Sequence, residues 1–225
     1  MSQSQAPSGA CRETPDGGKE AVHLVDAEQH MALAAWVDAA DRISRREAPT
    51  PALQELQAAL GRCFALSPQD VICRTLAAQA EWLTADWLTM HGEPALPALQ
   101  TALDKAKLAA QSPEPHPEAW QALAETHLRL ARPLPAQSPQ QVLHLTQGLS
   151  AATRALALRP KYGMGLATLG ALQLLSAQGQ KDAPTRRTMA RTAAAALQQA
   201  QAIDGFLRAA VAPMNKTAEE LAAAP

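Results

Sequence analysis

The segment "PHPEAWQALAETHLRLARPLPAQSP", residues 115–139, decides the fold, because it holds one amphipathic helix between two proline-rich breaks. Trp120, Leu123 and Ala124 lie on the first turns after Pro117, and proline suits the first position of a helix. The prolines from Pro133 onward cannot continue that helix. An isolated amphipathic helix of this length is only marginally stable in water, so the surrounding sequence must supply its packing partner.

Helix breakers recur at a nearly constant spacing along the chain. Four similar helix endings, "CFALSP", "LAAQSP", "ALALRP" and "AQAIDG", lie 45, 47 and 45 residues apart. They close at Pro68, Pro113, Pro160 and Gly205. A second series of breaks falls between them, at residues 47–51, 91–97, 132–139 and 179–184. Each unit is therefore predicted to be a helix, a short loop, a second helix and a break.

The spacing of apolar residues between the breaks is helical. Apolar side chains recur in steps of three and four, as at Val142, Leu145, Leu149, Ala152 and Leu156. About a fifth of the residues are alanine, and continuous β-branched runs are missing, so the sequence predicts an all-α protein. We expect nine helices, at residues 20–47, 51–66, 69–90, 95–111, 117–132, 139–158, 161–178, 184–203 and 206–222.

These helices are predicted to form antiparallel hairpins that stack into a right-handed solenoid, because one hairpin cannot bury its apolar stripe alone. Residues 20–222 then form one domain of about four hairpins and a C-terminal capping helix, after a disordered segment at 1–19. Pro213 should kink or split the last helix. That helix carries an apolar stripe at Leu207, Val211, Met214, Ala218 and Leu221.

The repeated pattern resembles tetratricopeptide repeats. That family has a large residue, then leucine three positions later with glycine or alanine beside it, and a proline that closes the unit. The triplets that match are Trp120, Leu123, Ala124; Leu166, Leu169, Gly170; and Cys73, Leu76, Ala77, with Pro160 as a closing proline. The resemblance implies a scaffold that binds another protein in a concave groove lined by the first helix of each repeat.

The longer unit of about 45 residues, with a Gly/Pro loop between its helices, looks like the repeat regions that follow the catalytic domain in large bacterial serine/threonine protein kinases. The chain itself has no kinase glycine-rich loop, "HRD" or "DFG" motif. A regulatory module of such a signalling system is therefore one alternative to a free-standing scaffold. A structural protein that self-assembles through its solenoid ends is another.

Charge and composition argue against several other classes of protein. The net charge of −1 provides no basic field for nucleic acid, and no apolar run is long enough to insert into a membrane. The N-terminus lacks the apolar core of a signal peptide. The three cysteines make no even disulfide framework, and Cys63 and Cys73 are interpreted as small buried core residues rather than a redox pair. We therefore expect a reducing, cytoplasmic location.

No catalytic motif is found in the sequence, so we expect no enzyme activity, no cofactor and no bound metal. His127 lies on the core side of its predicted helix, with His144 on the antiparallel partner. We interpret His127 as a buried, hydrogen-bonded residue rather than as a functional site.

The predicted groove is polar in two consecutive units and apolar in the next, where it presents Met164, Ala167, Ala171, Leu174 and Leu175. Such a surface suits an extended peptide or a helix. The side chains expected to contact the partner are Arg74, Glu81, Trp82, Glu118, Gln121, Glu125 and Arg129. Trp82 lies about 100° from the core stripe through Leu83, so it either reaches solvent or packs against the neighbouring repeat.

Overall fold

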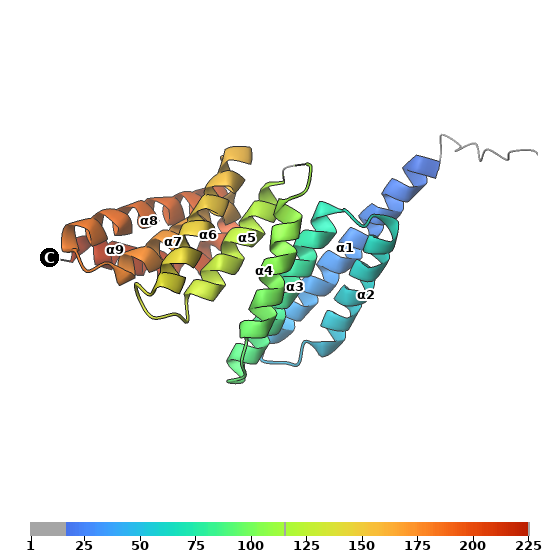
Figure 1. The fold of residues 1–225 in the computed structure, drawn as a ribbon, viewed down its shortest axis with the longest axis horizontal. Coiled ribbons are helices and arrows are strands. Elements are labelled where there is room, and N and C mark those ends of the chain that lie inside the picture. The colour runs from blue at the N-terminus through green and yellow to red at the C-terminus, as the bar shows by residue number, and fades with distance from the viewer. Residues whose placement is uncertain (1–16, 115, 225) are drawn as a thin grey trace, which may run out of the picture.

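The computed structural model describes residues 17–114 and 116–224, and this part of the chain is helical without any strand (Figure 1). Most of the predicted disordered segment, residues 1–16, lies outside the described residues. The α-helices are α1 (Gly17–Ser44), α2 (Thr50–Leu66), α3 (Val71–Met90), α4 (Leu96–Ala110), α5 (Pro117–Ala131), α6 (Pro139–Leu158), α7 (Gly163–Gly179), α8 (Ala183–Ile203) and α9 (Arg208–Ala223). A short 3-10 helix, η1 (Gly205–Leu207), precedes α9.

Side-chain caps fix several of the helix starts. Asp70 Oδ1 accepts a 2.8 Å hydrogen bond from the Cys73 N–H at the start of α3, and Asp182 Oδ2 accepts one of 2.9 Å from the Thr185 N–H at the start of α8. Ser138 caps α6 in the same way, as its position before Pro139 predicts. These bonds satisfy backbone donors that have no partner within the helix.

Helices that are neighbours in sequence pack against one another as pairs. The closest packing is between α1 and α2, α3 and α4, α5 and α6, α7 and α8, and α8 and α9. The first helix of each pair also contacts the first helix of the next pair, from α1 to α3 and onward to α9. The pairs thus follow one another along the long axis, and the helix direction changes from α1–α4 to α8 and α9 (Figure 1). This arrangement is compatible with a helical repeat.

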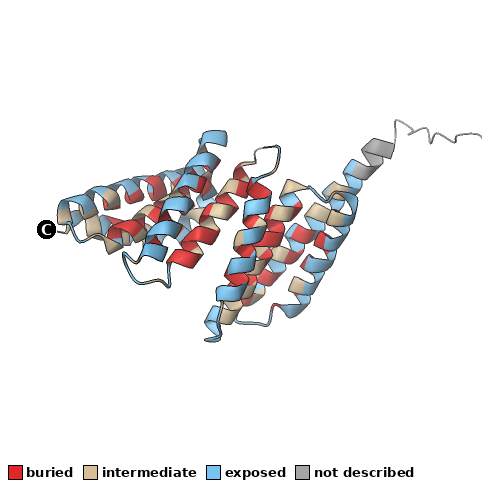
Figure 2. Cartoon of the chain, viewed as in Figure 1, coloured by how far each residue is buried: buried red, intermediate tan, exposed pale blue. Residues whose placement is uncertain are grey.

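Small residues let the helices approach closely. The buried faces between helices (Figure 2) consist largely of alanine, with Leu56, Leu128, Leu172 and Leu197 as the largest fully buried apolar side chains. A Cβ atom added to Gly170 on α7 would lie 2.6 Å from Leu197 Cγ on α8. The glycine of the repeat pattern is therefore required by helix packing rather than by backbone conformation.

The last helix packs against the pair before it. Val211 and Ala218 are buried with Leu174, Ala193 and Leu197, and the other residues of the predicted stripe lie against the same cluster. Pro213 lies inside α9, and the helix continues on both sides of it, so the helix is not split there.

Cys63 on α2 and Cys73 on α3 are joined by a disulfide bond, and the expectation that they are unpaired is therefore wrong. Both are fully buried, as predicted. The short turn between α2 and α3 brings their Cα atoms to 6.6 Å, a separation that a disulfide can span. The cysteine content therefore no longer supports the expected cytoplasmic location, which stays a prediction.

Among the helices that the structure describes, none combines the length and apolar character needed to cross a lipid bilayer.

Candidate functional site

The odd-numbered helices together line a shallow hollow along one face of the array, which we call the inner groove. It has a volume of about 230 Å³ and takes side chains from α1, α3, α5, α7, η1 and α9. Its polar part is formed by Trp36, Trp82, Gln121, Glu125, Arg129, Arg132 and Thr168. Its apolar part is formed by Leu128, Met164, Ala167, Ala171, Leu207, Ala210, Val211 and Met214.

Trp82 belongs to the wall of the inner groove and packs against the next pair of helices. Its side chain is only 5% exposed, and its Nε1–H donates a 2.9 Å hydrogen bond to Thr126 Oγ1 on α5. The guanidinium of Arg129 lies 5.2 Å from the centre of the Trp82 ring. Of the two alternatives considered for Trp82, the structure shows the packed one.

Arg129 connects α5 to α3 through charged groups. Its guanidinium pairs with Asp86 on α3, and its Nε donates a 3.1 Å bond to Glu125 Oε1 one turn earlier on α5. Because two carboxylates already neutralise the single positive charge of Arg129, it offers little attraction to a further anion.

Gln121 and Glu125 connect α5 to α7 in a similar way. Gln121 is 2% exposed, and its Nε2 donates a 3.1 Å bond to Thr168 Oγ1. Thr168 Oγ1 in turn donates a 3.4 Å bond to Glu125 Oε2. Four of the predicted site residues, Trp82, Gln121, Glu125 and Arg129, are thus brought together in the inner groove.

The other three predicted site residues lie elsewhere. Arg74 donates hydrogen bonds to the carbonyl oxygens of Leu108 at 3.4 Å and Pro68 at 3.1 Å. Glu81 accepts a 2.5 Å bond from Lys105 on α4. Glu118 pairs with Arg159 at 2.5 Å. Arg74 and Glu81 are directed toward α4, and Glu118 toward the end of α6, rather than into the inner groove.

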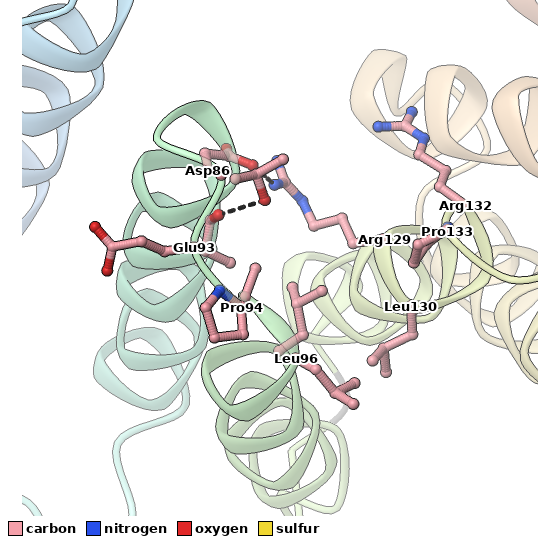
Figure 3. A pocket seen from close by; sticks show the side chains of 13 residues that line it. Asp86, Glu93, Pro94, Leu96, Arg129, Leu130, Arg132 and Pro133 are labelled. Carbon is pink, nitrogen blue, oxygen red and sulfur yellow. Dashed lines mark hydrogen bonds and ion pairs between the residues drawn. The ribbon is translucent and has the colours of Figure 1, made fainter.

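A larger cavity of about 710 Å³, which we call the loop pocket, adjoins this region (Figure 3). It lies between the end of α3, the α3–α4 loop and the end of α5, with Pro94, Leu96 and Leu130 among its apolar residues. Arg129 points toward Asp86 at its rim, whereas the guanidinium of Arg132 lies apart from this pair (Figure 3). A cavity of this size is typical of small-molecule or side-chain binding sites.

Arg132 belongs to three cavities at once. It lines the loop pocket, the inner groove and a third hollow of about 250 Å³ between α5, α7 and α9, which we call the cap hollow. Its side chain is exposed and makes no ion pair or hydrogen bond with the described residues. Unlike Arg129, Arg132 is therefore available to an anion brought by a partner.

The sequence did not indicate Trp36, Asp86 or Arg132 as site residues. Trp36 lines the inner groove from α1, and its Nε1–H is shielded from solvent without an acceptor in the described part of the chain. A buried N–H without a partner is costly, so an acceptor supplied from outside would be favoured. Asp86 lies four residues after Trp82 on α3, and this helical spacing could have placed it on the inner face. Arg132 was missed although it lies three residues after Arg129 inside the predicted helix 117–132, a spacing that places it on the same face.

The two histidines considered from the sequence lie outside the inner groove. His127 is 3% exposed, and its Nδ1 lies 3.0 Å from His144 Nδ1 on α6, so the prediction of a buried, hydrogen-bonded histidine is confirmed. Burial lowers the pKa of His127 to about 4, with smaller contributions from His144 and from the charge of Lys107. Both imidazole rings belong to the packing of α5 against α6.

A scan against protein-family models finds no match for this chain, and neither does a search of the curated proteins.

Proposed function

We propose that this chain is a non-catalytic scaffold that binds a segment of another protein in the inner groove. The observation that carries the proposal is the continuity of one hollow across five successive odd-numbered helices, with Arg132 at its junction with two further cavities. Grooves of this kind accept an amphipathic helix or an extended peptide. We further propose that the array is a right-handed solenoid related to tetratricopeptide repeats, in line with the 45-residue spacing of its helix endings.

The chemistry of the groove defines the kind of segment that fits. Met164, Leu207 and Met214 offer an apolar surface, and methionine adapts to partners of different shape. Arg132 offers an unpaired planar cation beside that surface, which suits bidentate pairing with a carboxylate. The proposed partner therefore presents apolar side chains next to an acidic residue.

Photo-crosslinking tests this proposal. A photoreactive amino acid at Met164, which is 42% exposed in the groove, should capture a partner from the native cell extract, and Arg132→Glu in the same chain should abolish the adduct. The control position is Leu143 on α6, which is 52% exposed but does not line the groove. Adducts that form equally at Leu143, or that survive Arg132→Glu, would show that the inner groove is not the binding site.

A further inference from the structure

A second concave site lies on the outer side of the array, away from the inner groove. It is a pocket of about 260 Å³, which we call the outer pocket, between α4 and α6 with α5 as its floor. Its polar residues are Lys107, His127, Gln147, Ser150 and Arg154, and Trp120 lies beside them. The outer pocket and the inner groove have no residue in common.

Every charged side chain that lines the outer pocket is a cation. Lys107 approaches Asp104 only at 4.0 Å, and the Asp104 side chain is 80% exposed to solvent. Arg154 makes no ion pair with the described residues, and its guanidinium stacks 4.6 Å from the centre of the Trp120 ring. Stacking restricts the guanidinium to the rim of the pocket without neutralising it. The pocket therefore carries a positive charge that nearby carboxylates barely reduce.

The positive charge of Lys107 affects the two histidines at the floor of the pocket. The pKa of His127 is lowered to about 4, mainly by burial, then by His144 and by Lys107. Burial and Lys107 also lower the pKa of His144. Both imidazoles are therefore neutral at pH 7, and their Nδ1 atoms, 3.0 Å apart, share one hydrogen bond. Neutral histidines cannot attract an anion by charge. They lie close enough to Lys107, however, for a change in the electrostatic field around Lys107 to affect them.

We propose that the outer pocket binds the phosphoryl group of a phosphate monoester, with Arg154 and Lys107 as its charged ligands. The guanidinium can donate two parallel hydrogen bonds to phosphate oxygens, and the ammonium adds a point charge. Ser150 and Gln147 supply neutral hydrogen-bond donors at the same rim. The volume is below the range of about 300–1,000 Å³ of sites for drug-sized molecules, so the pocket suits a small anionic group rather than a whole nucleotide.

The test uses the full chain and follows the imidazole signals of His127 and His144 by NMR at pH 7. Inorganic phosphate should shift these signals in a saturable way, whereas chloride at the same ionic strength should not. Lys107→Gln and Arg154→Gln should each weaken phosphate binding about tenfold or more, because each removes a charge-assisted hydrogen bond. Arg191→Gln on α8 is the matched control, since Arg191 is exposed and lies outside the pocket. It should leave the affinity unchanged.

A second experiment distinguishes two possible ligands of the outer pocket, a free phosphate monoester and a phosphorylated side chain of a protein. A short Gly/Ser peptide with one phosphoserine should bind more tightly than inorganic phosphate if the natural ligand is a phosphorylated protein, and equally if it is a free monoester. Both results support a phosphoryl site. The proposal is overturned if wild-type protein shows no saturable shift, or if Arg191→Gln weakens binding as much as the two pocket variants. Lys107 and Arg154 are both exposed, so their replacement leaves the core intact.

Discussion

The indole N–H of Trp82 on α3 is bonded to the hydroxyl of Thr126 on α5, and this contact joins two consecutive pairs of helices. Thr126 Oγ1 also donates a 2.8 Å bond to the Ala122 carbonyl, so it accepts and donates at the same time. Both side chains are buried, and the hydrogen bond therefore lies where an unpaired polar atom would be costly. Trp82 thus holds the array together in addition to forming a wall of the inner groove.

Trp82→Ala is expected to lower the free energy of unfolding by about 3–5 kcal/mol, because it removes a buried indole and leaves a cavity. Trp82→Phe keeps an aromatic ring but loses the N–H bond to Thr126, so it should cost less, about 1 kcal/mol for the hydrogen bond. Urea unfolding followed by circular dichroism measures both changes. A loss well below 1 kcal/mol for Trp82→Ala would show that the indole is not packed as described.

Gly170→Ala should destabilise the protein by about 1–3 kcal/mol, because the new methyl group would meet Leu197 Cγ at 2.6 Å and force α7 and α8 apart. Gly61→Ala on α2 is the matched control, since a Cβ there meets nothing within 4 Å. It should stabilise the protein by up to about 1 kcal/mol, because alanine has the higher helix propensity. Melting curves of the two variants should therefore move in opposite directions, and equal shifts would contradict the close approach of α7 and α8.

Acidification should destabilise the protein through His127. Its pKa in the folded state is about 4, below its ordinary value of 6.5, so the unfolded chain binds more protons between these values. The stability that neutral His127 contributes is complete above about pH 6.5 and is lost as the pH falls toward 4. Between pH 7 and pH 5 the loss should be about 2 kcal/mol.

Urea unfolding at pH 7 and pH 5 checks this pH dependence. His127→Leu should remove most of it, whereas His23→Leu, at an exposed position, should leave it as in the wild type. The assignment to His127 fails if the two variants keep the same difference in stability between the two pH values.

Removal of the disulfide between Cys63 and Cys73 should lower stability. The bond closes a loop with a sequence separation of 10 residues, and such crosslinks typically contribute about 2–4 kcal/mol. The double variant Cys63→Ala, Cys73→Ala should lose about this amount in urea unfolding. Mass spectrometry after alkylation of denatured, unreduced protein should find Cys63 and Cys73 unmodified. Modification of both would show that the pair is reduced in the isolated protein.

Deletion of residues 206–225 should expose the apolar surface that α9 covers on α7 and α8, where Leu174 and Leu197 are buried. The truncated chain is expected to melt at a lower temperature and to associate in solution, as measured by light scattering. A shorter deletion of residues 222–225 keeps the apolar stripe and serves as the control. Equal solubility and stability of all three chains would show that α9 is not a cap.

The helices of the fold could largely be predicted from the sequence, because the residues that start and end them act locally. Asp70, Ser138 and Pro117 mark helix starts by their own chemistry, and the structure begins α3, α6 and α5 next to them. The first helix was expected to reach residue 47 but ends at Ser44, because Arg46 adopts a positive φ of 62°. A positive φ at arginine is not encoded by residue type, so this boundary could not be predicted.

The site was less predictable because it depends on contacts between repeats. The helical angle of Trp82 left two positions open, in solvent or against the next repeat, and only the position of α5 shows that Thr126 accepts a hydrogen bond from its N–H. Arg74 has the right residue type for a groove, yet it donates hydrogen bonds to the carbonyl oxygens of Pro68 and Leu108 at the start of α3. The disulfide depends on the distance between α2 and α3, which spacing along the chain does not give.

The contacts between consecutive helix pairs differ from one junction to the next. Trp82 with Thr126 joins α3 to α5, whereas Gln121 with Thr168 joins α5 to α7. An array with interchangeable units could gain, lose or permute a unit without mismatch. In this chain both donors bond to a threonine hydroxyl, but the bonded residues are 44 positions apart at one junction and 47 at the other, so an exchange of two units should separate each donor from its acceptor. The side-chain hydrogen bonds between consecutive units thus fix the order of those units. We expect the array to tolerate neither a change in that order nor an internal duplication.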